Sequence, residues 1–221
     1  MTKPRILSAE DAKRLYDDLG AGQDGEAYYE DPALDLVVAH GSFATAQSIF
    51  EFGCGTGRFA QRLLGDHMPL AATYIAVDVS PVMAGLAKER VAAFAKRAMI
   101  LQTDGSMHLP IADDRIDRFI CAFVIDLLSD DDARALIHEA HRALRSGGLL
   151  CLTSLTRGRG VVPRLISHLW TAVHAILPQR VGGCRPVALR PLVDERLWKI
   201  DHMSQVAPFG IASDVLIAKK R

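Results

Sequence analysis

Short apolar runs alternate with longer amphipathic segments through the first two thirds of this 221-residue chain. The apolar runs predict five buried strands, at residues 48–52, 74–78, 99–102, 118–123 and 148–153. The segments between them have the 3.6-residue period of helices, at residues 58–64, 81–95 and 130–144. Alternation of strands with helices predicts a parallel sheet, because a crossover helix is needed to return the chain to the same edge.

Both ends of the chain depart from this alternation. The stretch up to His40 is predicted to be helical with a break at 20–22, and 198–209 with 211–219 are predicted to form an antiparallel strand pair. We therefore expect a Rossmann-like, doubly wound α/β sheet, mostly parallel with an antiparallel terminal strand, and with helices on both faces. The length and the 49% hydrophobic content predict a single domain over residues 1–221.

The composition argues against several classes of protein. No apolar stretch reaches the roughly 18 residues that cross a bilayer, and residues 1–5 contain no apolar signal core, so we expect a cytoplasmic protein. The four cysteines are far apart and have no accompanying histidine spacing, so no metal site is expected. Residues 1–156 hold 15 basic and 22 acidic side chains, whereas 157–221 hold 11 and 4. An anionic partner would therefore meet the C-terminal third.

A glycine-rich turn follows the first predicted strand. Gly53, Gly55 and Gly57 allow the backbone to approach a ligand closely, and the next helix offers unpaired N–H groups at its start. Dinucleotide-binding enzymes have the pattern G-x-G-x-x-G, with glycine or alanine at the position of Arg58. Arg58 therefore disfavours a nicotinamide dehydrogenase, which stays an alternative.

Carboxylates follow the next two predicted strands. Asp78 ends the second strand, where a carboxylate can accept hydrogen bonds from both hydroxyls of a ribose. Asp104 and Gly105 follow the third strand. The alternatives are that Asp78 caps the helix starting at Pro81 and that Asp104-Gly105 only forms a turn.

In order and spacing, the run 51–57, Asp78, Asp104 and the run 145–148 resemble the class I S-adenosylmethionine-dependent methyltransferases. The resemblance covers roughly residues 16–152, although Ser146 stands where proline is usual. It implies S-adenosylmethionine as the cofactor. It also implies the cofactor-binding residues, which are Glu51, Gly53, Cys54, Gly55, Gly57, Asp78, Val79, Met83, Asp104, Gly105, Ser106, Cys121 and Ala122.

On this basis the chain is expected to have four parts. They are an N-terminal helical cover (1–45), a cofactor-binding core (46–156), an inserted substrate-side helix or lid (157–193) and the terminal strand pair (194–221). In the resembled enzymes the main task is to hold donor and acceptor close in a dry pocket.

A proton acceptor is needed where the methylated atom carries a proton. The candidates are Asp126, His40 and His168, with His174 as a further histidine on the same predicted helix as His168. The alternatives are a helix cap for Asp126 and satisfied, partly buried positions for the histidines.

The inserted segment 157–193 holds six arginines and no acid. Within it, 161–177 has the pattern of an apolar helix, and 182–186 predicts a rigid turn. This helix could be a lid, an interfacial helix on anionic lipid, or part of the core with solvated arginines. The candidate substrate-contacting residues are Tyr28, Trp170, Arg180 and Arg185.

We therefore expect methyl transfer to a small, hydrophobic or lipid-like acceptor that could carry an anionic group, with contact to a membrane surface as a further possibility. The Asn-Pro-Pro-Tyr type of sequence typical of nucleobase-modifying relatives is absent after the fourth strand, and the net charge is zero, so nucleic acid is not an expected partner. The alternative is a protein that binds S-adenosylmethionine or S-adenosylhomocysteine without turnover. The acceptor atom and the oligomeric state are left open.

Overall fold

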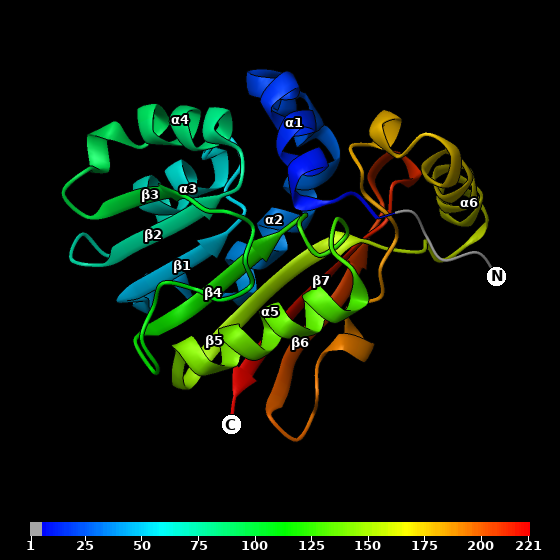
Figure 1. Ribbon diagram of the computed structural model, residues 1–221. Helices are drawn as coiled ribbons and strands as arrows, with labels where there is room; N and C mark the ends of the chain where they lie inside the picture. Colours follow the sequence, from blue (N-terminus) through cyan, green and yellow to red (C-terminus); the bar gives the residue numbers. More distant parts are fainter. Residues whose placement is uncertain (1–5) are drawn as a thin grey trace.

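The computed structural model describes residues 6–221, in which seven strands form one sheet in the order β3-β2-β1-β4-β5-β7-β6 (Figure 1). The strands are β1 (Ser48–Phe52), β2 (Thr73–Asp78), β3 (Ala98–Gln102), β4 (Ile116–Ala122), β5 (Leu144–Leu155), β6 (Trp198–Val206) and β7 (Ser213–Lys220). Strand β7 runs antiparallel to β5 and β6, and the other neighbours are parallel. The expected mostly parallel sheet with an antiparallel terminal strand is confirmed. Residues 1–5 lie outside the described residues. They include the start of the predicted N-terminal cover and the segment in which no apolar signal core is predicted.

The central strands β4 and β5 begin earlier than the sequence predicts. Ile116 pairs with Leu144, and the register shifts before Arg118 pairs with Leu149. The pairing is irregular at the glycines before Leu149, where Gly147 has a φ of +76°. In the structure they form an irregular part of β5, which is paired from its first residue.

Helices cover both faces of the sheet. They are α1 (Ala9–Leu19), α2 (Ala27–His40), α3 (Arg58–Arg62), α4 (Pro81–Arg90), α5 (Asp130–Ala143) and α6 (Val161–Ile176). Helices α2, α3 and α4 pack in one apolar cluster, whereas α5 packs in the other, together with the segment before β6. The predicted helices at 58–64 and 81–95 change form at Leu63 and Val91, since a π-helical turn and a 3-10 turn follow α3 and α4. None of the described helices has the length and apolar content needed to cross a bilayer.

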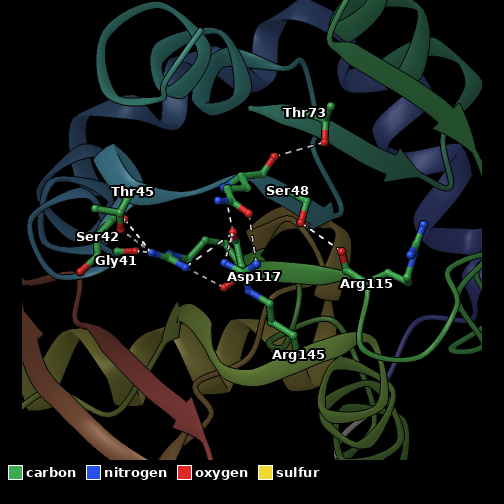
Figure 2. A network of polar contacts seen from close by, with 10 residues as sticks. Gly41, Ser42, Thr45, Ser48, Thr73, Arg115, Asp117 and Arg145 are labelled. Atoms are coloured by element: carbon green, nitrogen blue, oxygen red, sulfur yellow. Dashed lines mark hydrogen bonds and ion pairs between the residues drawn. The ribbon is translucent and has the colours of Figure 1, made fainter. Parts of the chain in front are cut away.

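Two buried charged residues of β4 tie down the chain between α2 and β1 (Figure 2). Arg118 donates from Nε to the carbonyl of Gly41 at 2.6 Å and from Nη2 to the carbonyl of Ser42 at 2.7 Å. Asp117 accepts from the backbone N–H of Gln47 at 2.7 Å. These contacts fix the start of β1. They thereby help to position the loop that follows β1.

The strand order reverses between β1 and β4. The loops that leave these two neighbouring strands therefore diverge, which opens a crevice at the carboxyl ends of the parallel strands. Helices α1 and α6 lie beyond those ends (Figure 1). The candidate site is found in this crevice.

Candidate functional site

A cavity of about 440 Å³ lies at the carboxyl ends of β1, β2, β3 and β4, and the loop after each of these strands lines it. The roof comes from α1, from the 3-10 helix η1 (Gly20–Glu26) and from α2, which contribute Tyr16, Gln23, Glu26 and Tyr29. A cavity of this size and position is typical of a small-molecule site in an α/β protein.

The loop after β1 passes very close to the loop after β4. The backbone N–H groups of Gly53 and Cys54 both donate to the carbonyl of Val77 at 2.8 and 3.1 Å, and Gly53 has a φ of +77°. A Cβ atom at Gly53 would lie 2.3 Å from Cγ2 of Val124. Glycine is therefore required here both by the backbone conformation and by the space available.

Backbone N–H groups from the loops after β1 and β2 hold the carboxylate of Asp78. Its Oδ2 accepts from the N–H of Gly55 at 2.8 Å, and its Oδ1 accepts from the N–H of Ser80 at 2.9 Å. Burial raises the pKa of Asp78, while these N–H groups act in the opposite direction by stabilising the charged form. Each carboxylate oxygen has further lone pairs with which to accept from a ligand hydroxyl.

Glu51 lies beside Asp78 in the same wall. Its Oε2 accepts from the hydroxyl of Tyr74 at 2.7 Å in a fully buried contact. Burial, with a further contribution from the Asp78 carboxylate, raises the pKa of Glu51 to about 7. This acid is therefore partly protonated near neutral pH unless a cation binds next to it.

The roof is bound to the glycine loop through ion pairs and hydrogen bonds. Asp24 of η1 accepts from Oγ1 of Thr56 at 2.5 Å and from Nη2 of Arg90 at 2.7 Å. Arg58 donates to Oε2 of Glu30 at 2.9 Å. The arginine that argued against a dinucleotide fingerprint thus joins the loop to α2.

The cavity wall is strongly acidic. Among the described residues that line it, Arg58 is the one basic side chain. The acidic side chains in the wall are Glu26, Glu30, Glu51, Asp78 and Asp132. Burial, followed by the influence of Glu26, raises the pKa of Glu30 to about 7. Such a wall favours a positively charged ligand.

The structure brings most of the predicted cofactor-binding residues to this cavity. Those that line it are Glu51, Gly53, Cys54, Gly55, Asp78, Val79, Gly105, Ser106 and Ala122. Four do not line it. Met83 and Cys121 are fully buried in the core, and a Cβ at Gly57 would lie 2.8 Å from the Cα of Ala87, so this glycine serves helix packing. Asp104 is exposed and accepts from the backbone N–H of Ser106.

None of the predicted catalytic residues lines the cavity. Asp126 is fully buried, and its Oδ2 accepts from the backbone N–H of Leu155 at 3.1 Å. His40 stacks on His202 with the ring centroids 3.6 Å apart, and Nδ1 of His168 contacts a carbonyl within α6. His174, the further candidate, bonds instead to the carbonyl of Gly183. Spacing along the chain could not show this for Asp126 and His40, because the fold supplies their partners from distant segments.

The predicted substrate residue Tyr28 points away from the cavity, and its neighbour Tyr29 points into it. Tyr28 is 55% exposed, and its ring lies edge to face with Phe209. Tyr29 lines the cavity and donates its hydroxyl to Oε2 of Glu26 at 2.8 Å. Adjacent helical residues point about 100° apart, so the choice between them depends on how α2 is rotated against the sheet.

The other predicted substrate residues also lie outside the cavity. Trp170 donates from Nε1 to the carbonyl of Cys184 at 2.9 Å, so it supports a segment that lines the cavity without lining it itself. Arg185 is paired with Asp130 at 2.6 Å. Arg180 is exposed after the end of α6. Neither of these arginines is among the residues that line the cavity, and their contact with a substrate stays a prediction.

Sequence reasoning missed the acids on the roof side and did not select Phe123 as a site residue. Glu26 lies in η1, directly after the glycines that marked a break, and no helical period leads to it. Phe123 faces Tyr29 edge to face at 6.0 Å, and it has a φ of +55° that is rare outside glycine. The apolar run at the end of β4 was the one signal for Phe123.

A parallel sheet with a glycine loop at its switch point and a carboxylate after the second strand defines a Rossmann-like nucleotide-binding protein. Residues 49–148 match the family model described as a methyltransferase domain. This match, together with the relatives described below, supports a class I S-adenosylmethionine-dependent methyltransferase family, whose cofactor is S-adenosylmethionine. This match argues against the nicotinamide dehydrogenase alternative.

Two curated relatives share one name, which describes an O-methyltransferase. The malonyl-[acyl-carrier protein] O-methyltransferase of Hamiltonella defensa subsp. Acyrthosiphon pisum is 32% identical over 112 residues, which are 50% of this chain and 38% of the relative. The protein of the same name from Dechloromonas aromatica is 35% identical over 108 residues, which are 48% of this chain and 36% of the relative. The chain thus spans well under half the length of these relatives.

The fold is shared with solved structures across nearly the whole chain. The [4+2]-cyclase SpnF has a TM-score of 0.71 at 15% identity, and the match covers 99% of both chains. Because a structure described as a cyclase has this same fold, the fold alone does not define the reaction.

Proposed function

We propose that this protein transfers the methyl group of S-adenosylmethionine to a small, apolar acceptor, lipid-like in character. One observation carries the proposal: a single cavity is lined both by the glycine loop with Asp78 and by an apolar and aromatic wall that includes Phe123 and Tyr29. Two ligands that react with each other need such a shared, enclosed space.

The residues present fit S-adenosylmethionine. Asp78 can accept from the ribose hydroxyls. The loop at Gly53 and Gly55 lines the cavity without side chains, so the amino-acid part can approach its backbone closely. The acidic wall matches the positive sulfonium and ammonium groups. When bound, the cofactor supplies a methyl group activated by the positive sulfur.

The wall for the acceptor is mostly apolar. Phe123, Val124, Leu127 and Leu128 line the cavity after β4, and they exclude water from the reacting atoms. The names of the two relatives describe methylation of an acyl group on a carrier protein, which supports a lipid-like acceptor. Arg58, the one basic side chain among the described lining residues, is already paired with Glu30, so this lining offers no free cation to an anionic group on the acceptor.

Glu26 is the side chain best placed to take a proton from the acceptor. It lines the cavity, and Tyr29 donates to one of its oxygens while Oε1 stays available. Burial raises the pKa of Glu26, which makes its carboxylate a better proton acceptor than an exposed glutamate. Tyr29 holds the carboxylate in position.

The test combines binding with turnover. Calorimetric titration with S-adenosylhomocysteine should show saturable binding, and S-adenosylmethionine with a labelled methyl group should label an apolar fraction of a lipid extract. Glu26→Gln should retain the binding and lose most of the labelling. Absence of binding would overturn the proposal, and binding without labelling of any fraction would support the non-catalytic alternative instead.

A further inference from the structure

The most deeply buried side chains of helix α6 are polar, and Trp170 and Ile166 are partly buried beside them. The two buried residues of this helix are Ser167 and His174. Ser167 accepts from the backbone N–H of Gly158 at 2.9 Å, and Nε2 of His174 lies 3.1 Å from the carbonyl of Gly183. An amphipathic helix of a globular protein normally turns its apolar side inward. In α6 this arrangement is reversed.

Ile166 of α6 is partly buried against Gly210, but the other large aliphatic side chains of α6 and of its C-cap point outward. They are 40% to 85% exposed and comprise Val161, Val162, Leu165, Leu169, Val173, Ile176 and Leu177, which we call the apolar stripe. Residues 161, 165, 169 and 173 are four apart, so they share one side of the helix. The sequence-based alternative that this side of the helix packs in the core is therefore wrong. No residue of α6 is among the described residues that line the cavity, so α6 does not act as its lid in this structure.

An exposed aromatic turn extends the stripe. Phe209 is 77% exposed between β6 and β7, and Tyr28 packs edge to face on it at 5.6 Å. The turn lies directly against α6, because a Cβ at Gly210 would fall 2.2 Å from Cδ1 of Ile166 and 3.4 Å from Cγ1 of Val162. Aromatic rings next to an aliphatic stripe are typical of surfaces that contact the lipid–water boundary.

The segment that carries the stripe has charges of one sign. Residues 157–193 contain no acid. Arg185 and Arg190 pair with acids outside this segment. The remaining arginines are exposed, form no ion pair with a described residue, and flank both ends and one side of α6: Arg157, Arg159, Arg164 and Arg180.

We propose that α6 is an interfacial helix that docks this protein on an anionic lipid surface, with the apolar stripe and Phe209 among the acyl chains and the four free arginines at the headgroups. The pairing of exposed aliphatic and basic groups on one helix matches such a surface in both polarity and charge. A second copy of the chain fits less well, since a two-fold contact would bring these arginines against their own equivalents. The inference does not depend on methyl transfer.

The test is co-sedimentation with vesicles of phosphatidylcholine, with and without phosphatidylglycerol. We expect binding to the anionic vesicles that falls with added salt and is about a hundredfold weaker in the triple variant Arg157→Gln, Arg164→Gln, Arg180→Gln. The double variant Leu165→Glu, Leu169→Glu should lose binding. Leu70→Glu is the matched control, because Leu70 is 89% exposed just before β2, and it should bind like the wild type.

Two further measurements keep the outcomes distinct. All altered side chains are exposed, so circular dichroism and calorimetric titration with S-adenosylhomocysteine should match the wild type for every variant. Failure of the nucleotide titration with intact vesicle binding would affect only the methyl-transfer proposal. Docking is overturned if the anionic vesicles do not bind the wild type, if the stripe variants bind unchanged, or if sedimentation equilibrium shows a wild-type dimer that the stripe variants dissociate.

Discussion

The backbone N–H of Gly55 donates to Oδ2 of Asp78 at 2.8 Å, and this bond joins the loop after β1 to the end of β2. The two segments thus form one continuous wall of the cavity. A Cβ at Gly55 would lie 2.9 Å from Oε1 of Gln23 in the roof. Wall and roof are therefore in contact at this glycine, and changes at Asp78 should affect both the ligand and the loop.

We expect Asp78→Ala to lower the affinity for S-adenosylhomocysteine about 10- to 100-fold. The variant removes a charged acceptor for the ribose hydroxyls, and each hydrogen bond to a charged group is worth about 1.5–3 kcal/mol. Calorimetric titration measures the effect. Asp66→Ala is the control, since Asp66 is exposed in the turn after α3 and its loss should leave the affinity unchanged. Undiminished affinity of Asp78→Ala would contradict the assignment of this site.

Gly53→Ala should destabilise the fold through two separable effects. The φ of +77° costs about 1–2 kcal/mol for a residue with a Cβ, and the new methyl group would also collide with Val124. Val124→Ala in the same chain should recover only the part due to the collision. Urea unfolding of both single variants and the double variant measures the coupling, and strictly additive losses would show that the two loops do not touch as described.

The contribution of three buried carboxyls to the stability of the protein should fall as the pH rises from about 5 to 7. Glu30, Glu51 and Asp126 all have their pKa raised to about 7, in each case mainly by burial. Between the ordinary carboxyl pKa near 4 and this value, the folded state binds more protons than the unfolded state. Each carboxyl then lowers the free energy of unfolding by up to about 1.4 kcal/mol per pH unit. Urea titrations at several pH values measure the slope.

Glu51→Gln should make that slope less steep, because glutamine keeps an acceptor for Tyr74 and does not titrate. Glu139→Gln is the matched control. Arg142 lowers the pKa of Glu139 to about 2. The contribution of Glu139 to the free energy of unfolding is therefore lost only when the pH falls below its ordinary pKa of 4.5. Its removal should leave the slope between pH 5 and 7 unchanged. An identical slope for wild type and Glu51→Gln would mean that Glu51 is charged throughout this range.

Arg118→Met should lower the free energy of unfolding by about 3–5 kcal/mol, as expected when one partner of a buried charged network is removed. The carbonyls of Gly41 and Ser42 would lose their guanidinium donor, and the carboxylate of Asp117 would keep only Arg145 as its ion-pair partner (Figure 2). Arg115→Met is the control, because that side chain is exposed and only its carbonyl takes part in the network. Equal midpoints in urea for the two variants would contradict this account.

The sequence by itself determined the sheet and much of the cofactor side of the site. Apolar runs and helical periods indicate the elements directly, and the loop from Gly53 to Gly55 with Asp78 is encoded by residues next to the strand ends. Such features depend on local backbone requirements and on the common edge of a parallel sheet. They can therefore be predicted without knowing how distant segments pack.

Only the tertiary structure decided which side chains face the cavity from the roof and which side of α6 faces outward. The rotation of α2 places Tyr29 inside and Tyr28 outside, and the polar partners of Ser167 and His174 turn the aliphatic side of α6 away from the protein. A helical period shows that a helix has two unlike sides. It does not show which side is buried, because that depends on contacts with residues far away in the chain.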